Sequence, residues 1–136
     1  MTATNARAVV IDSSALVAML VDAGQRGQWV ESAIRGIRLV APQLAPFEVA
    51  NVLRRQSLAG MIDETSAALA HQDLLDLSID LWPYSAVAAR TWELRGTVTA
   101  YDASYVALAE LLGLPLVTLD ERLAKANGPR CPVLTP

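Results

Sequence analysis

Short apolar runs rich in β-branched residues alternate with longer segments of helical periodicity along the chain. The apolar runs predict buried strands at residues 7–11, 38–41, 79–82 and 115–118, and a weaker strand at 131–134. Apolar periodicity, with glycines closing several segments, predicts helices at 14–22, 28–35, 46–59, 63–75, 85–95, 102–112 and 121–127. This alternation is typical of α/β proteins, in which right-handed helical crossovers join parallel strands. We therefore expect a three-layer α/β/α sandwich.

The length and composition indicate one compact domain over residues 1–136, with no repeat, linker or low-complexity segment. Such a chain buries enough surface to fold without disulfides or a structural metal. Its mean hydropathy, +0.32, is high for so small a domain. We expect a second apolar surface that is buried against another copy of the chain or a partner.

Single copies of histidine and cysteine restrict the chemistry. His71 and Cys131 cannot supply a zinc site of His/Cys type or an internal disulfide, and an unpaired cysteine favours a reducing cytoplasm. No apolar run approaches the roughly 20 residues needed to cross a bilayer, and residues 1–5 do not resemble a signal peptide. We expect a cytoplasmic protein without membrane contacts.

The net charge of −3 shows no general attraction for nucleic acid. An anionic partner would have to be held by local arginines or by a bound cation. Two arginine pairs, Arg54 with Arg55 and Arg90 with Arg95, are explained by default as solvated helix faces. Contact with an RNA backbone is the alternative for these four side chains.

Four acidic residues fall at strand ends or helix starts. Asp12 and Asp120 directly follow predicted strands, whereas Glu48 and Asp102 begin predicted helices. The carboxyl ends of parallel strands and the starts of the following helices share one edge of a sheet, where α/β proteins bind ligands. The four carboxylates are therefore expected to converge at this edge.

Two interpretations of these acids remain open. Each one is suited to cap or support a helix N-terminus, and the protein would then be a non-catalytic α/β binding module. Alternatively, carboxylates that gather in a partly buried site repel one another unless a hard cation neutralises them. Oxygen-only ligands suit Mg²⁺ or Mn²⁺, which can promote hydrolysis of a phosphodiester without histidine.

Segments around all four acids resemble those of a known family. The segments are VIDSSAL at 10–16, FEVANVL at 47–53, YDASYVALAE at 101–110 and TLDERL at 118–123. In this order and spacing they resemble the PIN-domain ribonucleases, and in particular the VapC toxins of toxin-antitoxin pairs. The resemblance covers essentially the whole chain.

The resemblance implies a parallel sheet of order 3-2-1-4-5 and an endoribonuclease that depends on Mg²⁺ or Mn²⁺. It assigns catalysis and metal binding to four acids: Asp12, Glu48, Asp102 and Asp120. It assigns supporting roles to three polar residues: Ser13, Thr118 and Asn51. It also implies a homodimer, an RNA substrate and inhibition by a VapB-like antitoxin. Leu119, between Thr118 and Asp120, is larger than the residue often found there in the family.

Other phosphate-handling folds lack their necessary residues here. A receiver domain needs a second acid beside Asp12 and a lysine at the last strand, but Ser13 and Ser14 follow Asp12 and the only lysine is Lys125. A haloacid-dehalogenase-like phosphatase needs an aspartate where Ser14 stands. No glycine-rich phosphate-binding loop or dinucleotide fingerprint occurs in the sequence.

Overall fold

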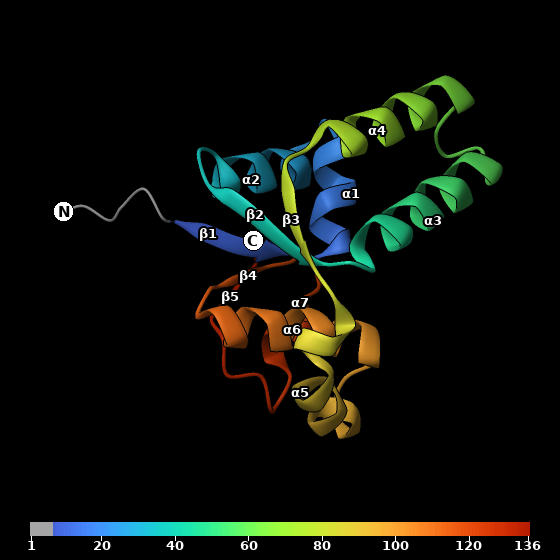
Figure 1. The fold of residues 1–136 in the computed structure, drawn as a ribbon. Helices are drawn as coiled ribbons and strands as arrows, with labels where there is room; N and C mark the ends of the chain where they lie inside the picture. The colour runs from blue at the N-terminus through green and yellow to red at the C-terminus, as the bar shows by residue number, and fades with distance from the viewer. Residues whose placement is uncertain (1–6) are drawn as a thin grey trace.

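A computed structural model describes residues 7–136, and its centre is a five-stranded parallel sheet of order β3-β2-β1-β4-β5 (Figure 1). The strands are β1 (Ala8–Ile11), β2 (Arg38–Pro42), β3 (Ile79–Trp82), β4 (Leu116–Val117) and β5 (Val133–Leu134). The five predicted strands and the sheet order implied by the family resemblance are confirmed. The expectation that the chain begins without a signal peptide concerns residues outside the described range.

Helices cover both faces of the sheet and complete the three layers (Figure 1). One face carries α1 (Ser13–Val21), α2 (Gln25–Ile34), α3 (Ala45–Leu58) and α4 (Glu64–Asp76). The other carries α5 (Ala88–Glu93), α6 (Ala100–Leu112) and α7 (Glu121–Lys125), with short 3₁₀ turns η2 (Tyr84–Ala86) and η3 (Leu94–Gly96) beside α5. Within residues 7–136, every helix is too short or too polar to span a bilayer.

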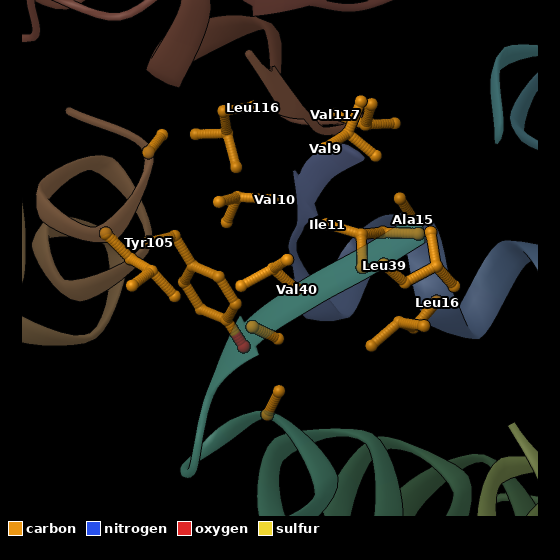
Figure 2. Packing of buried hydrophobic residues seen from close by; sticks show 14 of the residues in the cluster. Val9, Val10, Ile11, Ala15, Leu16, Leu39, Val40, Tyr105, Leu116 and Val117 are labelled. Atoms are coloured by element: carbon orange, nitrogen blue, oxygen red, sulfur yellow. The ribbon is translucent and has the colours of Figure 1, made fainter. Parts of the chain in front are cut away.

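The central strand β1 is buried on both faces because helices pack against each side of the sheet. Figure 2 shows Val10 and Val40 beside Tyr105 of α6, whereas Ile11 and Leu39 lie next to Leu16 of α1. Val10 and Ile11 have no exposed surface. A strand buried on both faces reads as a continuous apolar run, and residues 8–11 have this pattern. The core therefore fixes where β1 ends and where its next residue lies.

Two predicted helices differ from those in the structure. The single helix expected at 85–95 is wrong, because Val87, with φ −120° and ψ 0°, separates η2 from α5 and buries its side chain in the core. Helix α2 begins at Gln25, earlier than the predicted residue 28, and runs through Gly27. A Cβ atom at Gly27 would lie 1.9 Å from the carbonyl oxygen of Asp22, so only glycine allows this close approach to the preceding turn.

Candidate active site

The ends of the adjacent strands β1 and β4 bring Asp12 and Thr118 together. Ile11 pairs with Val117 in the sheet, so the residues that follow them lie side by side at the carboxyl edge. The buried hydroxyl of Thr118 donates a hydrogen bond to Oδ2 of Asp12. Thr118, which the sequence predicts as a supporting residue, therefore contacts Asp12 directly.

Asp12 is a buried carboxylate held by three donors. It caps α1 by accepting from the backbone N–H of Ala15 at 3.0 Å, and its Oδ1 also accepts from the Ser14 hydroxyl at 2.6 Å. Burial raises the pKa of Asp12 above the ordinary aspartate value, and the charge of Asp102 raises it further, although the hydrogen bonds oppose the rise. An ionised Asp12 is therefore costly unless positive charge lies nearby.

Ser14 contacts Asp12 and was not among the predicted site residues. Its Oγ also accepts from the backbone N–H of Leu119 at 3.0 Å, so one hydroxyl links α1 to the segment after β4. The predicted Ser13 lies instead beside the hydroxyl of Tyr105. A serine two residues after an N-cap aspartate is within reach of the cap carboxylate, and this spacing is the signal that could have identified Ser14.

Asp102 lies in the first turn of α6 and is not its cap. The helix begins at Ala100, and Thr99 is the N-cap because its hydroxyl accepts from the backbone N–H of Asp102 at 3.1 Å. Partial burial raises the pKa of Asp102, and the neighbouring charge of Asp120 adds to the rise. The capping interpretation is therefore wrong for Asp102, whose carboxylate lines a pocket together with Asp120 and Arg122.

Asp120 has the opposite electrostatic environment. It caps α7 by accepting from the backbone N–H of Arg122 at 2.9 Å, and the Arg122 guanidinium lies 3.3 Å from the same oxygen. Burial raises its pKa, but the combined contacts with Arg122 outweigh burial and lower the pKa below the ordinary aspartate value. Asp120 therefore fits the capping interpretation and also faces the pocket of Asp102.

Glu48 lies in the first turn of α3, next to Tyr105. Leu44, the N-cap of α3, makes no side-chain capping bond, and Glu48 itself does not cap the helix. Its Oε1 accepts a hydrogen bond of 2.6 Å from the Tyr105 hydroxyl. Burial, the Glu48 contact and the Asp12 charge raise the pKa of Tyr105, so its phenol remains a proton donor. Asn51, the third supporting residue predicted, is exposed one turn after Glu48.

The four acids are linked one to the next along one edge of the sheet and do not gather around a single point. The charge of Asp102 raises the pKa of Asp12, and the charge of Asp120 raises the pKa of Asp102. Tyr105 links Glu48 to this group, because it donates to Glu48 and is affected by the charge of Asp12. Within the part of the chain that the structure describes, no three acidic, histidine or cysteine side chains are grouped as a metal site. The closer convergence expected from the sequence is not seen, and the assignment of the four acids as metal ligands remains a prediction.

The arginines singled out from the sequence have different surroundings. Arg90 is engaged in the fold, where it pairs with Glu110 at 2.7 Å and donates to the carbonyl oxygen of Gly128 at 2.7 Å. The guanidinium of Arg95 lies over the ring of Trp92, 4.6 Å from its centroid. Arg54 and Arg55 are exposed on α3. Arg90 therefore fits neither the interpretation as a solvated surface residue nor the alternative of contact with RNA, because its side chain connects α5, α6 and the loop before β5.

Comparison with known proteins identifies the family. The family model for the PIN domain matches residues 9–129. The chain belongs to the PIN-domain family. Ribonuclease VapC9 of Mycobacterium tuberculosis is 37% identical to this PIN domain over 125 residues, which are 92% of this chain and 95% of the relative. Ribonuclease VapC1 of the same species is 38% identical over 125 residues, or 91% and 94% of the two chains. The predicted VapC-type PIN domain is therefore confirmed.

Solved structures agree with the PIN fold. PAE2754 from Pyrobaculum aerophilum superposes with a TM-score of 0.67 at 28% identity, covering 94% of this chain and 83% of the other. VapC20 of Mycobacterium tuberculosis, described as a sarcin-ricin loop cleaving toxin, gives a TM-score of 0.66 at 15% identity, with coverage of 87% and 94%. At that identity the second likeness concerns the fold alone.

Proposed function

We propose that this PIN-domain protein is a divalent-metal-dependent endoribonuclease that hydrolyses RNA phosphodiester bonds and acts as the toxin of a type II toxin-antitoxin pair. The observation that carries the proposal is the pair Asp12 and Asp102. Burial and neighbouring negative charge raise the pKa of both carboxyl groups. In a PIN domain that is 37% identical to a VapC ribonuclease, such a destabilised acidic pair is best explained as a cation site.

The donor set fits Mg²⁺, with Mn²⁺ as the alternative. Among residues 7–136, the acidic edge offers carboxylate and hydroxyl oxygens and no sulfur or imidazole, which is the chemistry preferred by hard cations. Asp12 and Asp102 would hold the ion, with Glu48 and Asp120 completing its surroundings directly or through water. Bound there, a divalent cation would supply a nucleophile at neutral pH and stabilise charge on the phosphodiester oxygens.

The residues of the chain supply the positioning. Ser14 and Thr118 hold Asp12 from two sides, so this carboxylate is presented in one orientation. Asn51, on the helix that carries Glu48, and Ser13, beside Tyr105, are proposed to orient the acids and their water. The exposed Arg122 at the pocket of Asp102 and Asp120 is placed to attract a phosphate group.

The alternative of a cap-only binding module is not favoured, because capping explains only half of the acids. Asp12 and Asp120 cap their helices, but Asp102 and Glu48 make no capping bond with their carboxylates. The chain is also 37% identical to a VapC ribonuclease over 92% of its length, which favours catalysis.

The direct test is cleavage by the purified protein and by a neutral variant. Wild type and Asp102→Asn are incubated with total RNA in Mg²⁺, in Mn²⁺ and in EDTA, and new RNA ends are sequenced. The same ends are mapped after brief induction in cells. Ends produced only by wild type and only with a divalent ion support the proposal. Equal cleavage by both proteins, or cleavage unaffected by EDTA, contradicts it.

We also propose protein partners: a VapB-like antitoxin and a second copy of the chain, acting in the cytoplasm. Exposed large apolar side chains support this part of the proposal, among them Phe47, Leu58, Met61, Tyr101 and Trp92. Light scattering of the isolated protein tests the homodimer. Co-expression with the antitoxin should reduce RNA cleavage, and a strictly monomeric protein would refute the homodimer.

A further inference from the structure

We propose that Tyr105 is a positioning residue for Glu48: its phenol fixes one carboxylate oxygen and leaves the other oxygen available to a divalent cation. This inference rests on the proposed function, because it concerns the same acidic edge. It gives a role to a core aromatic residue that the sequence pattern presents only as part of an apolar helix.

Tyr105 connects the two sides of the site through a rigid side chain. It lies one turn after Asp102 on α6, is 1% exposed and donates to Glu48 at 2.6 Å across 57 residues of sequence. Figure 2 shows its ring packed beside Val10 and Val40, with the hydroxyl oxygen directed toward the end of β2 and the start of α3. Packing thus places the phenol oxygen before Glu48 binds it.

Glu48 depends on this contact for its orientation. The side chain is partly exposed, has three rotatable bonds and accepts no other hydrogen bond from residues 7–136. Ordering such a side chain costs conformational entropy, which a preplaced donor offsets. Without the phenol, Glu48 is free to rotate toward solvent. A neutral donor also leaves the carboxylate charge in place, unlike an arginine or lysine.

The arrangement parallels the one around Asp12. There the hydroxyls of Ser14 and Thr118 hold a carboxylate, and at Glu48 the hydroxyl of Tyr105 does so. Partners that orient metal ligands change metal affinity or activity by about 10- to 100-fold when they are removed. We expect an effect of this size from loss of the phenol oxygen alone.

The test measures Mn²⁺ binding by calorimetry in the absence of RNA, for wild type and Tyr105→Phe. The variant retains the ring and its packing. We expect Mn²⁺ binding to weaken about 10- to 100-fold. RNA cleavage should fall at low Mn²⁺ and recover at high Mn²⁺, with the KM for RNA at saturating metal unchanged.

Ser104→Ala is the matched control. Ser104 is the preceding residue of α6, is buried, and donates its hydroxyl to the carbonyl oxygen of Tyr101 at 2.6 Å. The substitution removes a hydroxyl from the same helix, and this hydroxyl does not contact Glu48. Mn²⁺ affinity should remain at the wild-type value in this variant. If both variants weaken Mn²⁺ binding equally, the effect is structural and the proposal is wrong.

A double-mutant cycle with Glu48→Gln shows whether the phenol acts through Glu48. Tyr105→Phe should weaken Mn²⁺ binding in the wild-type background and have no further effect in the Glu48→Gln background. Equal effects in both backgrounds overturn the proposal. If wild type cleaves RNA and Tyr105→Phe binds Mn²⁺ as tightly as wild type, only the positioning role of Tyr105 is refuted. If wild type binds Mn²⁺ but cleaves no RNA, only the proposed function is refuted.

Discussion

The hydroxyl of Thr118 donates to the carboxylate of Asp12, although 106 residues separate the two in the chain. The same Oγ1 accepts from the backbone N–H of Asp120 at 2.9 Å. One buried side chain therefore connects the ends of β1 and β4 and fixes two of the four candidate acids. The geometry of the site is built into the sheet and does not depend on a loose loop.

Thr118→Val should destabilise the protein and weaken metal binding. It leaves Oδ2 of Asp12 and the Asp120 N–H without this partner, at a cost of about 1–3 kcal/mol in the free energy of unfolding. Mg²⁺ affinity should fall by about 10- to 100-fold. Urea unfolding and calorimetry measure the two effects.

Thr91→Val provides the control for that change. Thr91 is 2% exposed, and its Oγ1 has no hydrogen-bond partner among the described residues. Replacing this hydroxyl by a methyl should be neutral or stabilising. Equal destabilisation by both variants would show that the Thr118 contacts do not contribute to stability.

Asp12→Asn should abolish stabilisation by Mg²⁺. A ligand at 100 times its Kd stabilises the folded state by about 2.7 kcal/mol, and this gain requires the site. Asparagine remains a good N-cap, so α1 should still form. Thermal unfolding with and without Mg²⁺ measures the difference, which we expect in wild type only.

Asp63→Asn is the matched control, because Asp63 caps α4 through the Ser66 N–H at 2.7 Å and follows the C-terminal end of α3, whereas Glu48 lies in the first turn of that helix. It carries the same substitution at another helix cap and should keep the full Mg²⁺ shift. A Mg²⁺ shift retained by Asp12→Asn would exclude Asp12 from the metal site.

The metal-free stability should depend on pH through Asp102. The pKa of Asp102 in the folded protein is raised from 3.8, chiefly by burial and then by the charge of Asp120. A raised carboxyl pKa favours the folded state at low pH, and this contribution is lost as the pH rises through the raised value. In EDTA, the Tm of Asp102→Asn minus that of wild type should therefore increase from pH about 4 toward neutrality.

Mg²⁺ should reduce this pH dependence at neutral pH, because a bound cation stabilises the ionised wild-type carboxylate and not the amide. The carboxyl groups of Asp63 and Glu110 have lowered pKa values and are present in both proteins, so their contributions cancel in the difference. A Tm difference that is constant with pH would contradict the electrostatic account of Asp102.

Arg122→Ala should weaken RNA binding in a salt-dependent way. Arg122 is exposed at the pocket of Asp102 and Asp120, and loss of one phosphate contact should reduce the slope of log K against log salt by about 0.7 for single-stranded RNA. Fluorescence anisotropy in Ca²⁺ or EDTA measures binding without cleavage.

Arg35→Ala serves as the comparison, since Arg35 lies between α2 and β2, at the edge of the sheet opposite the acids. The two variants remove the same charge from the protein. Only Arg122→Ala should change the slope. Identical slopes for the two variants and wild type would remove Arg122 from the RNA interface.

The hydrophobic pattern of the chain was enough to predict the α/β architecture and the edge of the sheet where the acids lie. Local patterns carry this information, because a doubly buried strand must be continuously apolar and a helix has a 3.6-residue period. Asp12 directly after the apolar run 8–11 already placed a carboxylate at the carboxyl edge. The family resemblance added the order of the strands and the four acids.

Which side chains contact one another became clear from the folded chain. Val87 interrupts the helix expected at 85–95 because its burial in the core outweighs local helical preference. Thr118 donates its hydroxyl to Asp12 across 106 residues, and Tyr105 donates to Glu48 across 57 residues. Such contacts depend on strand register and on the packing of α6 over β1 and β2. These long-range relationships leave no periodic signal in the sequence.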